Sequence, residues 1–496
     1  MNNKCQIFTP KKTVLKMLDL AKYTEKLYGK KIIDNSCGDG NILVEIVKRY
    51  LQDAFSQNLS LDEIKFGLEN DIYGVEIDER HQKKCIENLN VIIKSHGIQK
   101  VKWKILKGDF LRMNFDIQFD YIIGNPPYVA YNNLDTETRK FIREKYEGCK
   151  KGKIDYSYAF IEESLKNLNK QGKLVYLIPN NTFKTVSGEK IREIICPYIS
   201  EIHNYTTEKI FKNIMTASSL IVLNKARTDE SFIYHDIVSN RKSIIYKKEL
   251  EGKWIFEKSK KESNYEQIDF GEYFHAATSV ATLLNSAFLI KDYSMDDKFV
   301  YTQGFKIEKS IVKNAYSPSN LNYGKNQLII FPYYYDENNK LNRYSPKVFK
   351  DKFPNCLEYF SQFKNSLLNR KSDVSAQWYE FGRSQALAHL NQNKLLTSTV
   401  ITKKIKIYEL GNNDIPFSGI YITPKKDVSL KFAELLLNTK QFHEYINKVG
   451  INLNGVSIRI TSKDINNFTF RNDNLSFFKI DDFQEYLEEK NELAFL

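Results

Sequence analysis

The sequence has little cysteine, little proline and no long apolar run. Its six cysteines, at positions 5, 37, 85, 149, 196 and 356, form no Cys-x-x-Cys pair. This excludes a disulfide scaffold and predicts free thiols in a reducing compartment, with no zinc or other metal site. No secretory signal opens the chain, and apolar runs such as LVYLI and SLIVL stop far short of the roughly 20 residues that cross a bilayer. With a mean hydropathy of −0.48, the composition predicts a soluble cytoplasmic protein without a membrane partner.

Positive charge is in excess. Lysine and arginine number 74 against 61 acidic residues, which gives a net charge of +13 and a pI near 9.0. Such an excess suits a polyanion such as nucleic acid, although many basic proteins bind none. A length of 496 residues exceeds what one hydrophobic core usually serves, so at least two domains are expected.

In the first half of the chain, short apolar runs alternate with segments in which apolar residues recur with the period of a helix. This alternation is typical of an α/β fold with a doubly wound, mostly parallel sheet. Strands are expected at 31–36, 72–78, 102–110, 119–125, 173–180, 202–207 and 218–225, and helices at 13–27, 40–55, 78–95, 156–169 and 187–199.

The alternation is lost after about residue 245. We therefore expect a catalytic domain over 1–245 and a mixed α+β domain over 246–496, with the charged segment 254–267 as the linker candidate. Strands are expected there at 328–335 and 419–424, and helices at 429–438, 439–448 and 481–494.

The first predicted strand ends in a turn that carries glycines and acids. Gly38 and Gly40 let the backbone turn sharply and approach a ligand at the carboxyl end of the strand. The turn lacks the full G-x-G-x-x-G pattern, and Asp34 and Asp39 stand where a phosphate site would carry a cation. These residues favour a cationic cofactor.

Acids also end the next two predicted strands. Glu76 stands where a carboxylate bonds both hydroxyls of a ribose in dinucleotide folds. Asp109 offers an acceptor to an adenine amino group, and the ring of Phe110 offers a surface for the base. Acids at three successive strand ends predict an adenosine pocket, although each taken singly is also compatible with a surface acid.

The fourth predicted strand runs into FDYIIGNPPYVAYNN, residues 119–133, which holds two of only eleven prolines. A strand-ending turn would explain them, because proline donates no backbone hydrogen bond to a sheet. The motifs FTP, DNSCGDG, GVEID, GDF and IIGNPPYV follow one another in this order. In this series of motifs the chain resembles the TaqI-like and Eco57I-like modification enzymes, which are NPPY-type amino-methyltransferases that act on N6 of adenine in DNA.

The resemblance implies S-adenosylmethionine as cofactor and a contact set that begins at the FTP segment. The implied cofactor contacts are Thr9, Asp34, Ser36, Gly38, Gly40, Glu76, Ile77, Asp109, Phe110 and Asn125.

The amino group of adenine is a poor nucleophile, because its lone pair is delocalised into the ring. If the side-chain oxygen of Asn125 and the backbone carbonyl of Pro126 each accept one N–H, the lone pair is aimed at the methyl group. Tyr128 offers a stacking surface to a base that has been flipped out of the duplex. The family usually supplies a second face from a loop before the seventh strand, where Phe211 stands, although a core role for Phe211 is an alternative.

The second half resembles the target-recognition part of the Eco57I-like enzymes, notably over 367–385. The candidates for contact with double-stranded DNA are Trp378, Tyr379, Arg383 and Arg459, with a structural role as the alternative for the two aromatic residues. The resemblance implies a bacterial enzyme that meets the nucleoid through DNA and acts as a monomer. Because a fused nuclease usually precedes the FTP-like segment, which here begins at residue 8, we expect a separately encoded cognate endonuclease or an orphan methylase.

Three alternatives stay open. Enzymes that methylate glutamine N5 in translation factors also carry NPPY, but they lack a long C-terminal extension. Methylation of cytosine N4 solves the same amine problem, usually with Ser or Asp at the place of Asn125. A non-catalytic specificity subunit would have no use for the acid series and NPPY together.

Overall fold

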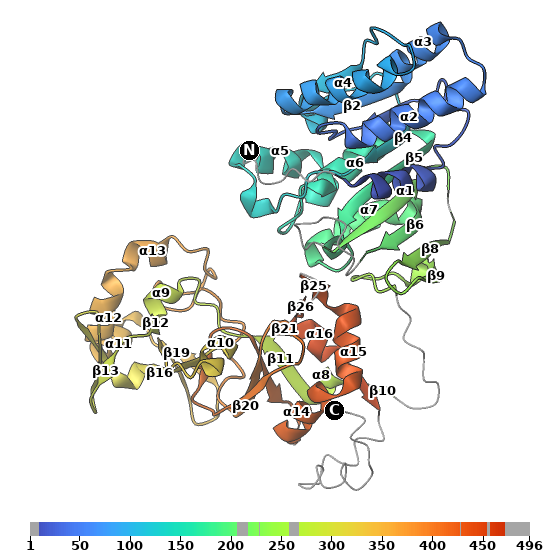
Figure 1. Ribbon diagram of the computed structural model, residues 1–496. Coiled ribbons are helices and arrows are strands. Elements are labelled where there is room, and N and C mark those ends of the chain that lie inside the picture. Colours follow the sequence, from blue (N-terminus) through green and yellow to red (C-terminus); the bar gives the residue numbers. More distant parts are fainter. Residues whose placement is uncertain are drawn as a thin grey trace. The chain divides into compact units, whose positions relative to one another are not determined.

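The computed structural model describes residues 9–205, 217–227, 229–256, 267–426, 428–453 and 457–471. The chain divides into two compact units, residues 1–259 with 451–456 and residues 260–450 with 457–496 (Figure 1). Within the described ranges, no helix combines the length and apolarity needed to cross a membrane. The expected boundary near residue 245 lies close to this division, and the role of each domain stays a prediction.

The first unit is built on a nine-stranded sheet in the order β3-β2-β1-β4-β5-β7-β6-β8-β9. Neighbours from β3 to β5 are parallel, and β7 runs antiparallel between β5 and β6. This confirms the doubly wound, mostly parallel fold, whose strand order reverses between β1 and β4. The strands are β1 (Ile32–Asp34), β2 (Ile72–Glu76), β3 (Lys104–Lys107), β4 (Phe119–Gly124), β5 (Leu168–Pro179), β6 (Ile199–Asn204), β7 (Ser218–Asn224), β8 (Ser231–Asp236) and β9 (Arg241–Tyr246).

Successive side chains along each strand point to opposite faces of the sheet, so each strand contributes to two cores. Helices cover both faces. Ile32 and Ile123 face one core and Ile33 and Ile122 the other. The core of Ile32 receives α1 (Lys11–Ala21), α2 (Asn41–Ser56), α3 (Leu61–Asp71) and α4 (Glu79–Lys94). The core of Ile33 receives α5 (Thr136–Lys145), α6 (Ser157–Asn167) and α7 (Glu189–Ile195).

Several elements differ from the expectation. The helix expected over 13–27 ends at Ala21, because Lys22 adopts a left-handed φ of 57° and caps it. Helix α3 was missed although Ser60 and Glu63 form a capping box at its start. The division between the units after residue 259 falls within the linker candidate 254–267, whose first residue, Trp254, is buried in the first unit and stacks on Phe183 at 6.0 Å. Residues 257–266 and the helix expected at 481–494 lie outside the described residues.

The second unit has two cores, separated by the sheet β11-β24-β20-β22. Tyr421 and Leu396 face one core and Ile422 and Leu395 the other. Its strands are β10 (Gln267–Asp269), β11 (Phe274–Thr278), β12 (Leu289–Ile290), β13 (Ser294–Met295), β14 (Phe299–Thr302), β15 (Phe305–Glu308), β16 (Val312–Tyr316), β17 (Leu328–Ile330), β18 (Tyr333–Tyr335), β19 (Leu341–Arg343), β20 (Lys394–Thr397), β21 (Val400–Thr402), β22 (Ile407–Leu410), β23 (Ile415–Pro416), β24 (Ile420–Pro424), β26 (Ser457–Arg459) and β27 (Thr469–Arg471). Its helices are α8 (Phe270–Tyr273), α9 (Asn285–Phe288), α10 (Pro318–Asn322), α11 (Pro346–Lys352), α12 (Pro354–Ser361), α13 (Lys364–Leu368), α14 (Leu430–Asn438), α15 (Lys440–Val449) and α16 (Ser462–Asn466).

Strand β25 (Ile451–Asn452) is grouped with the first unit. The single strand expected at 328–335 is two strands in different sheets, because Phe331 and Pro332 interrupt it. The helices expected at 429–438 and 439–448 are confirmed as α14 and α15.

Candidate cofactor and catalytic site

The carboxyl ends of β1, β2 and β4 bring the predicted site residues to one edge of the sheet. The turn after β1 holds Gly38 at φ 52° and Gly40 at φ 83°, both in the left-handed region that glycine adopts most readily. A Cβ at Gly40 would lie 2.6 Å from Cys85 Sγ on α4. Gly40 therefore serves the turn and also the close packing of this turn on the helix.

Glu76 joins the two turns that follow β1 and β2. Its Oε2 accepts the N–H of Gly38 at 2.9 Å and its Oε1 the N–H of Asp78 at 2.8 Å. Each carboxylate oxygen retains a second lone pair, so acceptance of ribose hydroxyls is compatible with these bonds. The sequence did not indicate that the same carboxylate also fixes the shape of the pocket.

Asp34 ends β1 and is 1% exposed. Burial raises the pKa of its carboxyl to about 7; the N–H of Ser36 acts in the opposite sense, and the charge of Glu76 adds to the rise. Two close carboxylates, one of them without solvent, favour a cationic ligand, which would stabilise the ionised form. The carboxylates of Asp34 and Glu76 therefore fit a positively charged cofactor.

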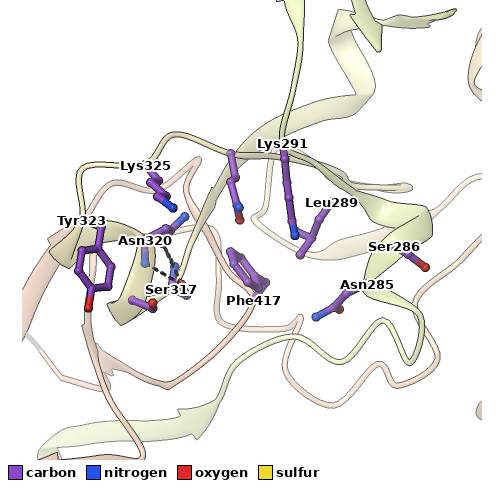
Figure 2. Close-up of a pocket in the computed structure, with 11 residues that line it drawn as sticks. Asn285, Ser286, Leu289, Lys291, Ser317, Asn320, Tyr323, Lys325 and Phe417 are labelled. Atoms are coloured by element: carbon purple, nitrogen blue, oxygen red, sulfur yellow. Dashed lines mark hydrogen bonds between the residues drawn. The ribbon is translucent and has the colours of Figure 1, made fainter. Parts of the chain in front are cut away.

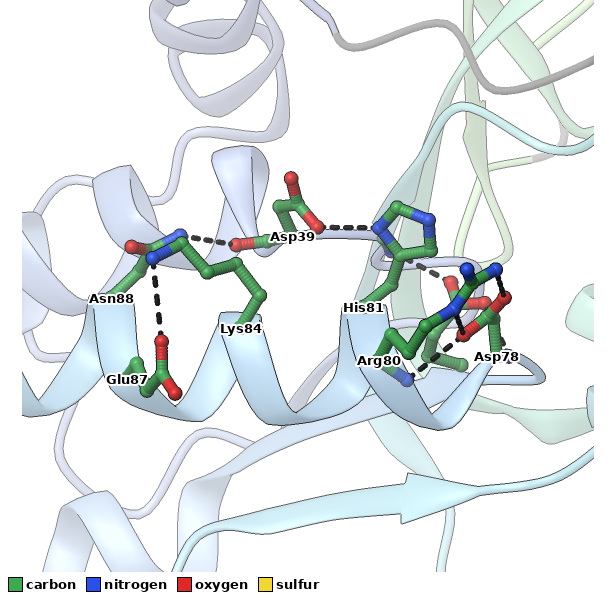
Figure 3. Close-up of polar contacts among 9 residues, drawn as sticks. Asp39, Asp78, Arg80, His81, Lys84, Glu87 and Asn88 are labelled. Carbon is green, nitrogen blue, oxygen red and sulfur yellow. Dashed lines mark hydrogen bonds and ion pairs between the residues drawn. The ribbon is translucent and has the colours of Figure 1, made fainter. Parts of the chain in front are cut away.

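Asp39 lies on the rim of the same turn and is bound to α4 (Figure 3). Its Oδ1 lies 2.6 Å from Nδ1 of His81, and its backbone oxygen accepts the Asn88 side-chain amide at 2.9 Å. The sequence placed Asp39 among the acids but gave no role to His81. A spacing of 42 residues hides this pair, because only the strand order brings α4 under the turn.

The remaining predicted cofactor residues lie in differing surroundings. Ile77 is 54% exposed just beyond Glu76, where an apolar surface is open to a ring. Asp109 Oδ1 accepts the N–H of Leu111 at 3.0 Å. Phe110 is 1% exposed and stacks on Phe160 at 5.7 Å, so in this structure it is a core residue. Thr9 is buried at the start of the described chain, two residues before α1.

Asn125 and Tyr128 contact each other directly. The hydroxyl of Tyr128 lies 2.5 Å from Asn125 Oδ1 and 2.6 Å from the Leu177 carbonyl oxygen. Burial, with a smaller effect of Asp155, holds the pKa of Tyr128 well above its ordinary value, so the hydroxyl stays protonated and donates. The residue as a whole is only half-buried. Ser36 Oγ donates to the Asn125 backbone carbonyl at 3.1 Å, which ties the NPPY turn to the cofactor turn.

Asp155 is a residue that the sequence analysis missed. The segment after NPPY pairs with it through a bridge between Ala130 and Asp155. Burial raises the pKa of Asp155 to about 6, against the hydrogen bonds from the N–H and Oγ of Ser157. The available signal was an acid two residues before a serine at the start of α6, which by itself predicts only a helix cap.

A buried polar network supports the ends of β1 and β5. Asn35 donates to Ser164 Oγ at 2.9 Å and accepts the Tyr176 hydroxyl at 2.7 Å, and the two hydroxyls lie 2.7 Å apart. A Cβ at Gly124 would lie 3.3 Å from Asn35 Oδ1. The small residue before Asn125 therefore leaves room for the network directly below the NPPY turn.

The DNA-contact candidates are not equivalent. Tyr379 is 3% exposed and stacks on Phe349 at 4.1 Å, which places it in the core rather than on a surface. Trp378 is half-buried beside it, and Arg383 pairs with Asp373 at 3.0 Å. Arg459 is exposed on β26. Phe211 lies outside the described residues, and its stacking role stays a prediction.

Comparison with known proteins bears on the same segment. Residues 41–211 match the model of the Eco57I restriction-modification methylase family. The chain is 23% identical over 484 residues to the type II restriction enzyme and methyltransferase RM.Eco57I of Escherichia coli, covering 78% of this chain and 47% of that protein. It is 28% identical over 246 residues to the type II methyltransferase M.BstVI of Geobacillus stearothermophilus, covering 45% and 43%. A third relative, M.HincII of Haemophilus influenzae, is 24% identical over 421 residues, covering 74% and 76%.

The chain spans less than half the length of the Eco57I and BstVI relatives. The expected resemblance is confirmed: residues 41–211 match the Eco57I restriction-modification methylase family, and the relatives named above are type II restriction-modification enzymes and methyltransferases. These relatives do not favour the glutamine alternative.

The type IIL restriction-modification enzyme MmeI, solved in complex with DNA, matches 92% of this chain and 64% of its own with a TM-score of 0.56. A nuclease-deletion mutant of the type ISP enzyme LlaGI, solved with a DNA substrate mimic, matches 93% and 46% with the same TM-score of 0.56. Both are 13% identical to this chain, so the likeness shows the fold alone.

Proposed function

We propose that this protein is a site-specific DNA methyltransferase that acts on N6 of adenine in double-stranded DNA, with S-adenosylmethionine as methyl donor. The observation that carries the proposal is the contact between the Tyr128 hydroxyl and Asn125 Oδ1 at the end of β4. A fixed amide oxygen beside a half-exposed aromatic ring is what an extruded base with an amino group requires.

Asp34 and Glu76 would hold the cofactor, Asp34 through its charge and Glu76 through hydrogen bonds. When bound, S-adenosylmethionine supplies an electrophilic methyl group. An amide oxygen has two lone pairs, and we propose that Asn125 Oδ1, which lies beside the Tyr128 hydroxyl, accepts one N6–H while the Pro126 carbonyl accepts the other. The nitrogen lone pair is then turned out of the ring plane towards the cofactor.

We further propose that the second unit reads the DNA sequence, with Arg459 and Arg383 as candidate contacts. The protein would act as a monomer. The restriction-modification relatives support the substrate class.

The test is direct. Purified protein is incubated with isotope-labelled S-adenosylmethionine and with DNA that lacks adenine methylation, and the digested nucleosides are identified by mass spectrometry. N6-methyladenine is expected among the nucleosides, and sequencing of the treated DNA for modified bases should place it at one recurring sequence. Labelled N4-methylcytosine would show that the substrate is cytosine and not adenine. Label found only in protein glutamine would overturn the proposal.

Asn125→Ala should reduce methyl transfer by at least about 100-fold, the usual effect of removing one preset electrostatic contact. Cofactor affinity, measured by calorimetry, should change little, because Asn125 is argued to act on the base. Asn413→Ala, in an exposed turn of the second unit, is the matched control. Near-normal turnover in Asn125→Ala would contradict the proposed mechanism.

A further inference from the structure

The second unit contains a cavity of about 530 Å³ that the proposed reaction does not use (Figure 2). It lies between the region of α9 and β12, the segment that contains α10, and the turn after β23. The lining residues are Asn285, Ser286, Leu289, Lys291, Ser317, Ser319, Asn320, Tyr323, Lys325, Gln327 and Phe417.

The charge of this cavity has one sign. Its lining includes Lys291 and Lys325 and no acidic residue. Neither lysine forms an ion pair with any acid in the described part of the chain. A neighbouring cavity of about 610 Å³ is lined instead by Asp292 and Glu358 together with Lys306. The lining of the first cavity therefore carries positive charge alone, whereas that of the second carries both signs.

The polar side chains of the lining differ in how fully their hydrogen bonds are satisfied within the described residues. Gln327 Oε1 is buried and has no hydrogen-bond partner among the described residues. Asn285 Oδ1 accepts the Thr282 hydroxyl at 2.6 Å, while its amide N–H groups meet no described acceptor. By contrast, Ser317 and Asn320 satisfy each other in a capping box. A buried amide oxygen without a donor is unfavourable unless a ligand supplies one.

Aromatic surface completes the lining. Tyr323 is 71% exposed, and Phe417 forms part of the opposite wall. Ammonium groups suit phosphate, side-chain amides suit the edges of bases, and aromatic rings suit their faces. No simple anion offers partners for all three of these groups.

We propose that this cavity binds one nucleotide unit, with its phosphate on Lys291 and Lys325 and its base edge on Gln327 and Asn285. The nucleotide comes either from a DNA strand or from a free nucleoside phosphate, and the chemistry is the same in both cases. The DNA source rests on the proposed function, whereas the free-nucleotide source does not.

The test compares Lys291→Ala/Lys325→Ala with Lys347→Ala/Lys350→Ala, which removes two exposed lysines of α11 from the same unit. In the first arm, the affinity for a short DNA duplex is measured by fluorescence anisotropy over a range of salt concentrations, without methyl donor. If DNA supplies the nucleotide, the cavity variant should bind about tenfold more weakly, with a salt slope smaller by about one to two units, and the control should not change.

In the second arm, dAMP and ATP are titrated into the same proteins and followed by calorimetry. Saturable binding that the cavity variant loses and the control keeps would identify a free nucleotide as the ligand. Equal behaviour of both variants in both arms would overturn the proposal. If the double variant does not fold, Gln327→Glu, which adds a negative charge to a cavity proposed to bind an anionic ligand, is measured in the same two arms with the same criterion.

The outcome is independent of catalysis. Both arms measure binding in the absence of methyl transfer. Failure of the methylation assay would therefore leave this result intact, and failure here would leave the proposed reaction intact.

Discussion

Tyr128 offers two different groups to the proposed site, a buried hydroxyl and a half-exposed ring. The hydroxyl lies within hydrogen-bond distance of Asn125 Oδ1, and its single proton is donated either to that oxygen or to the Leu177 carbonyl. The sequence predicted only the stacking role. The polar role became visible once the turn was folded, because it depends on the distance between two side chains three residues apart.

Tyr128→Phe separates these roles, because it keeps the ring and removes the donor. We expect kcat to fall roughly tenfold, the effect of one lost hydrogen bond, with the KM for DNA little changed. Tyr128→Ala should lose more, because stacking is lost as well. Tyr131→Phe, which removes a nearby hydroxyl that contacts Arg143 at 2.8 Å, is the control. Steady-state kinetics measure kcat and the KM for DNA. An unchanged kcat in Tyr128→Phe would refute the role of the hydroxyl in orienting Asn125.

Asp34 predicts a pH dependence of cofactor binding. Its pKa is raised to about 7 in the folded protein from an ordinary value near 4 in the unfolded chain. The folded state thus binds the proton more tightly, and this group contributes less to stability as pH rises from about 4 to about 7. A cationic cofactor stabilises the ionised form of Asp34. Above pH 7 Asp34 is already ionised in the free protein, and this is the form in which its burial is least favourable.

We expect the dissociation constant of S-adenosylmethionine to rise as pH falls below about 7, by up to about tenfold per unit. Titration calorimetry at several pH values measures this dependence. Asp34→Asn keeps an acceptor for the Ser36 N–H but cannot ionise, so its affinity should be lower and much flatter with pH. A wild-type affinity that did not vary between about pH 8 and about pH 6 would contradict the role of Asp34.

At the scale of elements, the turn between β1 and α2 depends on its fit against α4. Gly40 and Gly29 have similar left-handed φ angles of 83° and 78°, but a Cβ at Gly29 would meet nothing within 4 Å. Gly29→Ala therefore measures backbone strain alone, and Gly40→Ala measures strain together with the clash against Cys85.

Gly40→Ala should lower the free energy of unfolding by about 1–3 kcal/mol more than Gly29→Ala, the range of overpacking effects. Denaturant unfolding provides the values. In a double-mutant cycle, Cys85→Ala should recover part of the excess loss, because it removes the sulfur that the new methyl group meets. Equal losses in the two glycine variants would show that the close approach to α4 has no energetic effect.

The elements of the first unit were largely predictable, because parallel strands are apolar runs with an acid or a turn at their ends. The positions of Asp34, Glu76 and Asn125 at strand ends were predicted in this way, and their roles stay predictions. The buried triangle of Asn35, Ser164 and Tyr176 was not, since its members come from β5, α6 and the turn after β1 and share no local pattern. For Tyr379 the sequence left a DNA contact and a structural role open, because a Trp-Tyr pair beside arginine looks identical in sequence whether its rings face a core or a groove.

At the scale of the whole molecule, the cofactor candidates all lie in the first unit, whereas the predicted DNA contacts lie in the second. Within the described residues, each unit has its own buried cores. A ligand that binds only one folded unit stabilises that unit by mass action and leaves the other unchanged.

Differential scanning calorimetry should therefore show two transitions, of which saturating S-adenosylmethionine shifts one. A ligand at 100 times its dissociation constant adds about 2.7 kcal/mol, which corresponds to roughly 5–10 °C for a unit of this size. Gly40→Ala should lower the same transition, which assigns it to the first unit, and Glu76→Ala should abolish the shift because Glu76 holds both turns of the pocket. If the ligand moved both transitions equally, the two units would unfold as one, and the cofactor's effect would not be confined to the unit that contains Asp34 and Glu76.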